Sequence, residues 1–457
     1  MESISQAVKA HRDFFRTGKT LDIEFRKDSL KKLKSVMQKY EAKIFDAFWA
    51  DLRKSKFEAF GTEIGMVYKE IKDHVKHIKK WAKPTWVLTD IINFYSRSRI
   101  YHEPYGVVLV MSPWNYPLQL ALTPLIGAIS AGNCAVMKPA HYSKNVSDVI
   151  GEIIAETFDP GHVSFFAGGR DVNQALLEER YDYIFFTGGP HLGKIVMEKA
   201  SRHLTPLTLE LGGKSPCIVE ADANLKVAAQ RITFGRYINS GQTCVAPDHL
   251  WAHKDIKDQL IKEISQCITK SYGQDPEESP DFCRIITDQQ FDRLEYLLNS
   301  AGKIVHGGRT NKTARYIEPT IIDQITLDDP IMQEEIFGPL LPVLEYTNLD
   351  DVIEAINDRE KPLAMYFFSA SESAKEKLLA RTSSGGGCIN DTVMHLSNPR
   401  MPFGGVGNSG MGSYHGKHSF DTFSHHRSIL HKTTKFNPSA AYAPYGNKLK
   451  FMKPFLQ

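Results

Sequence analysis

Strand-like and helix-like segments alternate from residue 106 to residue 201, and this alternation limits the folds open to the chain. The pattern predicts helices between successive strands, with strands at 106–111, 134–138, 163–166 and 183–186 and helices at about 118–131, 146–157, 172–179 and 192–201. The strands are continuous apolar runs, which is typical of a parallel sheet covered by helices on both faces. Such a sheet binds ligands beyond the carboxyl ends of its strands, where Lys138 and residues 187–189 fall.

The segments that flank this region have different patterns. Residues 1 to about 83 are predicted to be helical, because apolar side chains recur there at spacings of three and four residues. Segments 86–88 and 97–102 are predicted strands that form either a projecting arm or a plain hairpin on the same domain. A second alternating region runs from Ser215 to about Asn390. The chain is too long for one ordinary core, so we expect two α/β domains with a cleft between them.

The composition argues against several classes of protein. The 56 basic and 53 acidic side chains nearly balance, and no run of like charges predicts binding to nucleic acid. The six cysteines include no C-x-x-C pair, so neither a zinc cage nor a disulfide framework is indicated, which suits a reducing cytoplasm. The chain shows neither a secretory signal nor a run of 18 apolar residues, so we expect no membrane anchor.

Two histidine pairs, His74 with His77 and His415 with His418, share helical faces. Nothing in the spacing of carboxylates or cysteines completes a metal site around them. We therefore predict that these are surface histidines and that the protein has no metal site.

Cys244 and Glu210 are the first candidates for catalysis. Cys244 follows a Gly-opened turn, Ser240 to Thr243, where a cysteine can become an exposed nucleophile. Glu210 stands directly before Leu211 and a Gly-Gly break, where a glutamate can act as a general base. Either residue alone is more simply a buried apolar thiol or a solvated charge. Their combination with other segments favours catalysis.

Three further segments complete the set: Pro113-Trp114-Asn115-Tyr116-Pro117, Phe186 to Gly193, and Glu334-Glu335-Ile336-Phe337-Gly338-Pro339. In these segments, and from about residue 100 to about 430, the chain resembles the aldehyde dehydrogenase superfamily, with the motifs in the family's order. The short N-terminal part and the run from Met401 to Gly416 look most like its class 3 branch.

The resemblance implies two parallel-sheet α/β domains, one Rossmann-like, and a small β oligomerisation arm. Residues 1–83 and 107–210 would form the cofactor-binding domain, and residues 211–394 the catalytic domain. Residues 84–106 and 395–435 would form the oligomerisation and bridging arm, followed by a C-terminal tail at 436–457. The implied assembly is a homodimer.

The resemblance also assigns a site for NAD or NADP. Thr187, Gly188 and Gly189 lie where a strand becomes a helix, so exposed backbone N–H groups and the helix dipole would hold the diphosphate. By itself this segment could be an ordinary β-α turn. Lys138 would reach the adenosine ribose, Glu335 the nicotinamide ribose, and Phe337 the nicotinamide ring. Trp114 and Leu211, which adjoin Asn115 and Glu210, are assigned to the cofactor as well.

His141 departs from the family pattern, which commonly has a glutamate three residues after the lysine. A carboxylate there would repel a 2′-phosphate, so we expect this chain to accept NADP as well as NAD. The one G-x-G-x-x-G match, Gly405 to Gly410, does not follow a strand early in a β-α-β unit, so we do not assign it to phosphate binding. The resemblance places it against the catalytic domain instead.

These assignments predict oxidation of an aldehyde to a carboxylic acid, with medium-chain aliphatic or aromatic aldehydes suggested by the class 3 likeness. Cys244 would add to the carbonyl, giving first a thiohemiacetal and then a thioester. Asn115 and the Cys244 backbone N–H would stabilise the oxyanion, and Glu210 would activate the hydrolytic water. The alternatives are a thiol esterase or hydrolase without a redox cofactor, a CoA-acylating aldehyde dehydrogenase, and a non-catalytic binding protein.

Overall fold

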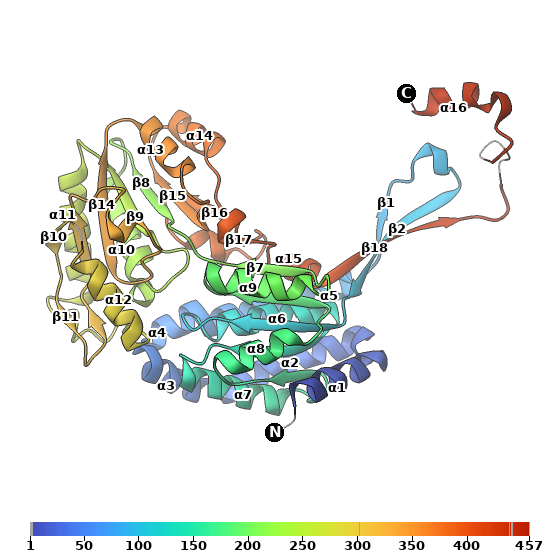
Figure 1. Ribbon diagram of the computed structural model, residues 1–457, viewed down its shortest axis with the longest axis horizontal. Coiled ribbons are helices and arrows are strands. Elements are labelled where there is room, and N and C mark those ends of the chain that lie inside the picture. Colours follow the sequence, from blue (N-terminus) through green and yellow to red (C-terminus); the bar gives the residue numbers. More distant parts are fainter. Residues whose placement is uncertain (1–2, 301, 438, 440–441, 457) are drawn as a thin grey trace.

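A computed structural model describes residues 3–300, 302–437, 439 and 442–456, and in it two sheets form the body of the molecule (Figure 1). The first sheet has six strands in the order β17-β7-β6-β3-β4-β5. Five of them are parallel, and β17 lies antiparallel to β7 at one edge. The strands are β3 (Val107–Ser112), β4 (Cys134–Pro139), β5 (Val163–Phe165), β6 (Tyr183–Thr187), β7 (Leu207–Glu210) and β17 (Gly410–Met411).

Helices cover both faces of this sheet, as its apolar strands predict. On one face, α6 (Gln119–Ala131) is buried at every residue because it lies between the sheet and a layer of N-terminal helices. That layer comprises α2 (Ile23–Lys39), α3 (Glu41–Leu52), α4 (Lys56–Ala59), the π-helix η2 (Phe60–Ile64), α5 (Gly65–Trp81) and also α7 (Lys144–Thr157). The other face packs against α1 (Ile4–Arg16), α8 (Arg170–Glu178) and α9 (Pro190–Ser201).

The second sheet has seven strands in the order β10-β13-β14-β9-β8-β15-β16, and only β10 at its edge is antiparallel. The strands are β8 (Pro216–Val219), β9 (His249–His253), β10 (Lys303–His306), β13 (Thr320–Asp323), β14 (Leu340–Tyr346), β15 (Ala364–Phe368) and β16 (Gly386–Ile389). One face packs on α10 (Leu225–Tyr237) and α11 (Lys257–Tyr272). The other packs on α12 (Asp288–Leu298), α13 (Leu349–Asn357) and α14 (Glu372–Arg381). The fold class predicted from the sequence is confirmed.

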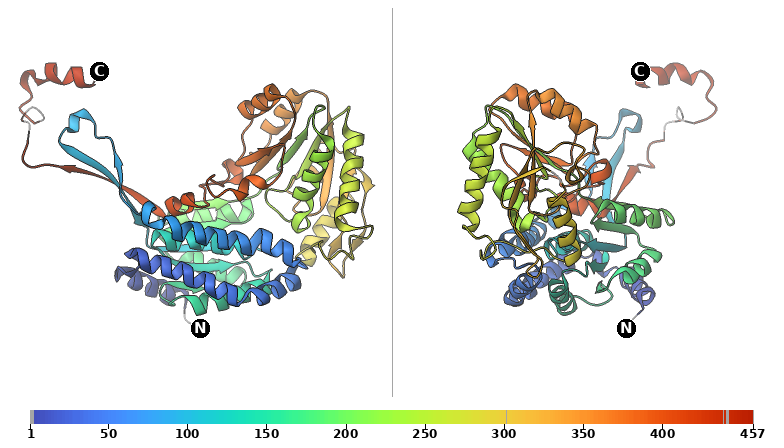
Figure 2. Two further views of the ribbon diagram at one scale, coloured as in Figure 1. Left: turned by 180° about the vertical axis from the view of Figure 1, so that it is seen from behind. Right: turned by 60° about the vertical axis from the view of Figure 1, so that its left-hand side comes forward.

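A third, antiparallel sheet projects from the body as an arm (Figures 1 and 2). It consists of β1 (Thr85–Val87), β2 (Ser96–Pro104) and β18 (Ser424–Lys432), in the order β1-β2-β18. The long pairing of β2 with β18 runs from Ser424 opposite Pro104 to Lys432 opposite Ser96. The helix α16 (Leu449–Leu456) lies beyond the end of the arm.

This sheet takes up less of the chain than the predicted arm. Within residues 395–435, β17 belongs to the first sheet, and α15 (Lys417–Thr422) packs on α6. The Gly-rich segment before β17 contacts both domains, because Gly404 lies beside Glu210 and also beside Gly385. These tertiary contacts leave no periodic signal in the sequence.

The prediction of surface histidines is wrong for His74 and His415. His74 is fully buried, and its Nε2 lies 3.0 Å from Oε1 of Glu70. His415 is buried as well, because the chain around Gly416 packs on α5, where the Gly416 N–H donates to the same Glu70 oxygen at 2.7 Å. Among the described helices, none is both long and apolar enough to cross a membrane.

Candidate active site

A cavity of about 1110 Å³ opens between the two α/β domains, at the carboxyl ends of strands of the first sheet and the amino ends of strands of the second. Its lining includes the three predicted catalytic residues, Asn115, Glu210 and Cys244. It also includes most of the predicted cofactor residues: Trp114, Thr187, Gly188, Gly189, Leu211, Glu335 and Phe337. The fold therefore brings together segments that are as far apart in the chain as Asn115 and Glu335.

A tight turn after α10 delivers Cys244 to the cavity. Three consecutive residues, Asn239, Ser240 and Gly241, have φ angles of 52°, 53° and 72°, in the left-handed region. A side chain at Gly241 would be blocked, because its Cβ would lie 2.3 Å from the carbonyl oxygen of Gly338. Left-handed non-glycine residues are strained and cluster at functional sites. The glycine that marked this turn in the sequence is thus required by both backbone angle and space.

Buried amides join the Cys244 loop to the Asn115 loop. The side-chain amide of Asn115 donates to the carbonyl oxygen of Gln242 at 3.0 Å, and its second N–H remains for another acceptor. Asn239 Nδ2 donates to the carbonyl oxygens of Asn115 at 2.9 Å and of Gln242 at 3.1 Å. The Gln242 side chain is itself held by Asn239, Arg284 and Ile286. These bonds fix the Asn115 amide close to the cysteine.

Burial dominates the electrostatics of the two reactive groups. It raises the pKa of the Cys244 thiol, with the carboxyls of Glu335 and Glu210 acting in the same direction. The backbone N–H groups of Cys244 and Val245 act in the opposite direction, because they hydrogen-bond the thiolate. Burial also raises the pKa of Glu210 well above its ordinary value, and neither of its oxygens has a hydrogen-bond partner. Glu210 can therefore hold a proton or take one up at neutral pH.

The segment that carries Glu335 and Phe337 is held by three side chains that had no predicted role: Lys214, Asp248 and Arg293. Lys214 binds the carboxylate of Asp248 and donates to the Glu334 carbonyl at 2.8 Å, while Asp248 accepts the Ile336 N–H at 2.8 Å. On the other side, Arg293 donates to the Ile336 carbonyl at 2.6 Å. Lys214 directly follows the Gly-Gly break after Glu210, whereas Asp248 and Arg293 gave no signal, because the groups that they hold are distant in the chain.

Three features of the cavity suit the binding of a dinucleotide. The helix α9 begins at Pro190 behind Gly189, which makes no side-chain cap hydrogen bond and has open space beside it, so the helix N-terminus is free to receive an anion. The buried Thr187 hydroxyl and the Glu335 Oε1 have no hydrogen-bond partner. The Trp114 and Phe337 rings meet edge to face, with centroids 5.3 Å apart. Thr187, Glu335 and Phe337 would thus hold phosphate, ribose and ring, respectively.

Lys138 and His141 do not line the cavity. Lys138 ends β4 as a buried side chain, donates to the Pro139 carbonyl at 2.7 Å, and has its pKa lowered by burial to about 8. His141 is exposed on the loop that follows, and its pKa is lowered by partial burial and by the nearby Lys138 charge. Both residues lie at the carboxyl end of β4, on the side where the adenosine half of a dinucleotide would end.

One group of side chains in the described part of the chain could approach a metal ion. The ligand atoms of His102, Asp421 and His426 lie within 4.8 Å of one another. The group lies at the root of the arm, outside the cavity, and Asp421 already binds Lys417.

Comparisons with known proteins agree on one family. The aldehyde dehydrogenase family matches residues 1–429. The 4,4'-diaponeurosporen-aldehyde dehydrogenase of Staphylococcus aureus is 49% identical over all of both chains. The dimeric, NADP-preferring aldehyde dehydrogenase of Rattus norvegicus is 42% identical and covers 97% of this chain and 100% of its own. The substrate-bound structure of S. aureus AldH superposes with a TM-score of 0.98 at 48% identity, covering 100% of each chain.

Proposed function

The chain belongs to the aldehyde dehydrogenase family and is an NAD(P)-dependent enzyme that oxidises aldehydes to carboxylic acids, and we propose that Cys244 is its nucleophile. One observation carries this assignment. Cys244 and Glu210 line the same cavity as Asn115, whose amide is bonded to the Cys244 loop at 3.0 Å. A nucleophile, a base and an oxyanion donor in one cavity form the set that acyl chemistry requires.

In the proposed cycle, the Cys244 thiolate adds to the aldehyde carbon, and the Asn115 amide and the Cys244 N–H donate to the new oxyanion. An oxidised nicotinamide held by Glu335 and Phe337 would supply the acceptor for the hydride that leaves the thiohemiacetal carbon. The acyl group is then held on sulfur as a thioester, and Glu210 removes a proton from the water that attacks it. The carboxylic acid leaves, and the Cys244 thiol is restored.

Glu210 also separates this proposal from its alternatives. A CoA-acylating enzyme passes the acyl group to a thiol, whereas a buried carboxyl without a partner beside Cys244 suits activation of water. A cofactor-free thiol hydrolase would have no use for the open helix terminus at Gly189 or for the carboxyl of Glu335.

The substrate range and setting are also proposals. We expect apolar aldehydes, from medium-chain aliphatic and aromatic compounds to longer chains, since one relative at 49% identity acts on 4,4'-diaponeurosporen-aldehyde. We expect a cytoplasmic homodimer, which is consistent with six free cysteines and with a relative named as dimeric.

The test is a Cys244→Ala variant studied by both turnover and binding. We expect no formation of reduced cofactor with any aldehyde of a panel from hexanal to benzaldehyde to a long polyene aldehyde. Cofactor binding, followed by fluorescence titration, should persist because the proposed dinucleotide residues lie mainly on the first domain. Retained turnover would place the nucleophile elsewhere.

A further inference from the structure

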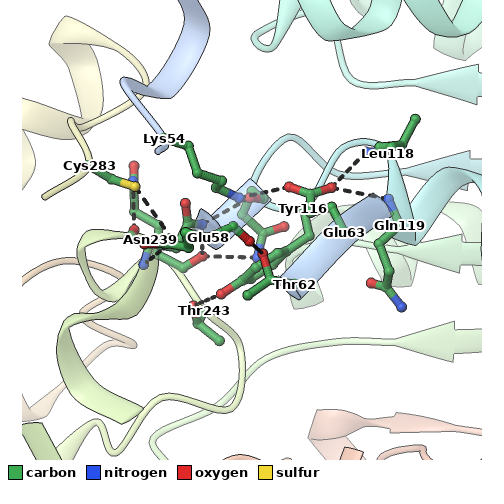
Figure 3. Close-up of polar contacts among 12 residues, drawn as sticks. Lys54, Glu58, Thr62, Glu63, Tyr116, Leu118, Gln119, Asn239, Thr243 and Cys283 are labelled. Atoms are coloured by element: carbon green, nitrogen blue, oxygen red, sulfur yellow. Dashed lines mark hydrogen bonds and ion pairs between the residues drawn. The ribbon is translucent and has the colours of Figure 1, made fainter. Parts of the chain in front are cut away.

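A buried polar network lies beneath the two catalytic loops and connects them to the N-terminal helices (Figure 3). Its centre is an ion pair in which Lys54 Nζ and Glu63 Oε1 are 2.7 Å apart. Both side chains are fully buried, with 0% exposure. A buried pair of this kind is often no more stabilising than apolar side chains of the same size. Stability of the fold alone therefore does not explain its presence here.

Glu63 anchors the end of the Asn115 loop. Its second oxygen accepts the backbone N–H groups of Leu118 at 3.0 Å and Gln119 at 3.1 Å. These groups begin α6, whose N-cap makes no side-chain hydrogen bond of its own. A carboxylate at a helix N-terminus satisfies the free N–H groups and the helix dipole. Asn115 lies only three residues before Leu118, so Glu63 fixes where its loop ends.

Lys54 links this anchor to the Cys244 loop through an aromatic ring. Its Nζ lies 4.4 Å from the centre of the Tyr116 ring, a distance typical of a cation-π contact. The Tyr116 hydroxyl in turn lies 2.7 Å from the hydroxyl of Thr243. Thr243 is bonded directly to Cys244 in the chain. Lys54 thus contacts Tyr116, which follows Asn115, and Tyr116 in turn binds Thr243, which precedes Cys244.

Glu58 holds the strained turn before the cysteine. Its Oε1 accepts the backbone N–H of Asn239 at 2.9 Å and the Cys283 thiol at 3.5 Å. Asn239 is the first of the three left-handed residues, and its side chain donates to the Asn115 carbonyl at 2.9 Å. Glu58 is therefore linked to the same two loops as Lys54, but through Asn239 instead of Tyr116.

The π-helix η2 explains how two glutamates of one short segment serve the same cluster. In an α-helix, side chains five residues apart point about 140° away from each other. A π turn closes its hydrogen bonds from residue i to i+5 and brings such residues nearer to one side. Glu58 and Glu63 are five residues apart, and the π-helical segment Phe60–Ile64 begins after Glu58 and includes Glu63. The widened turn directs both toward Lys54.

We propose that Lys54, Glu58 and Glu63 are positioning residues of the dehydrogenase, which hold the Asn115 and Cys244 loops at a fixed separation across the two domains. The inference rests on the proposed roles of Asn115 and Cys244. None of the three touches the aldehyde or the cofactor in this scheme. They act by placing the oxyanion donor against the nucleophile, where small displacements are costly to rate.

Glu58 offers a matched pair of variants. Glu58→Gln keeps a carbonyl oxygen for the Asn239 N–H, whereas Glu58→Met keeps the size of the side chain and removes the acceptor. We expect the single-turnover rate of reduced-cofactor formation to fall about 10²-fold in Glu58→Met and to stay within about threefold in Glu58→Gln. Cofactor affinity should not change. Equal rates in Glu58→Met and wild type would overturn the proposal.

The ion pair is tested with both charges removed together, since Lys54→Met alone would leave a buried carboxylate without a counterion. In Lys54→Met/Glu63→Gln the amide oxygen introduced at position 63 could still accept from Leu118 and Gln119, while the contact with the Tyr116 ring is lost. We expect a folded protein whose single-turnover rate is lower by about tenfold. A folded double variant with the wild-type rate would overturn the role of Lys54.

Arg26→Met is the control, because Arg26 is a buried cation of the same domain that bonds to Thr20 and to Ser130 near the far end of α6. It should lower thermal stability and leave the single-turnover rate unchanged. The same rate loss in Arg26→Met as in Glu58→Met would reduce the effect to general destabilisation and overturn the proposal. Failure of the proposed nucleophile would look different. In that case Cys244→Ala would form reduced cofactor as fast as the wild-type enzyme.

Discussion

The environment of Cys244 disfavours its thiolate, the form required of a nucleophile, since burial and two neighbouring carboxyls raise the pKa of the thiol. Burial likewise raises the pKa of Glu210 well above its ordinary value, and it raises the pKa of Glu335 to about 8. These shifts disfavour the Cys244 thiolate at neutral pH. The backbone N–H groups of Cys244 and Val245 favour the thiolate, and the Glu210 carboxylate, once formed, could accept the proton of the thiol.

The pH dependence follows from the direction of these shifts. The reactive forms of Cys244 and Glu210 are the deprotonated ones, and a raised pKa means that their fraction grows as the pH rises. We expect kcat/KM to increase from about pH 7 to about pH 9, with alkylation of Cys244 by iodoacetamide rising in parallel. A rate that is flat over this range would show that the thiolate is already formed at neutral pH.

Glu210→Gln should separate the two halves of the reaction. Only hydrolysis of the thioester strictly needs the base, so the variant should release about one equivalent of reduced cofactor per site in a burst and then turn over slowly. Stopped-flow absorbance with hexanal measures both phases. Loss of the burst itself would mean that Glu210 chiefly activates the thiol.

His141 bears on the choice between NAD and NADP. A glutamate at this position would repel a 2′-phosphate, and removal of one like-charge contact changes relative binding by about five- to hundredfold. His141→Glu should therefore shift the ratio of kcat/KM values toward NAD. Because the pKa of His141 is lowered, its charge assists NADP only as the pH falls below the ordinary histidine range. His203→Glu, at another exposed histidine, is the control, and an equal shift there would exclude a specific role.

At the level of secondary structure, the site depends on short irregular turns that join regular elements. The turn η4 (Ile238–Gly241) after α10 leads to Cys244 at the cavity, and the left-handed Phe337 before β14 lines the cavity itself. The π-helix η2 places Glu63 at the end of the Asn115 loop. The Gly241 and Gly338 segments are in close contact, and buried Arg236 binds the carbonyls of Gly338 and Pro247. The Cys244 loop and the Glu335 segment are consequently one rigid unit.

Gly241→Ala tests this unit. A Cβ at Gly241 would clash with the carbonyl oxygen of Gly338, so the two segments must separate. The φ of 72° at this position is also strained for alanine. We expect a loss of about 10²-fold in kcat, by the cost of misplaced reacting groups, with the protein still folded by circular dichroism. Gly169→Ala is the matched control, since its Cβ meets open space at an ordinary φ, and its kcat should equal that of wild type. Full activity in Gly241→Ala would show that the segments move freely.

In the molecule as a whole, the projecting arm (Figure 1) carries apolar side chains that the rest of the chain leaves exposed. Its hairpin exposes several large apolar side chains, with Leu88 99% exposed and Trp86, Ile91, Phe94 and Tyr95 all more than half exposed. Apolar surface of this kind marks an interaction site. A strand edge that projects from the body offers free backbone groups to a second copy of the chain.

Leu88→Asp/Ile91→Asp should therefore convert the expected dimer to a monomer in sedimentation velocity, while single-chain folding is retained. Leu204→Asp is the control, because Leu204 is 90% exposed on the body outside the arm. A variant of the arm that sediments as the wild type does would place the oligomer contact elsewhere.

Local patterns in the chain were enough for the alternation of strands and helices, the family motifs and most of the candidate catalytic and cofactor residues, which line the cavity. Each depends on periodicity or on a short contiguous string, as at Gly241 to Cys244 or at Glu335 to Gly338. Burial and pairing between distant residues cannot be read from such local patterns. The buried His74, the Lys54–Glu63 pair and the backbone contacts of Asp248 and Arg293 involve partners that only folding brings together. A hydrogen bond to a distant carbonyl leaves no mark on residue type, so tertiary structure alone decided how these residues support the site.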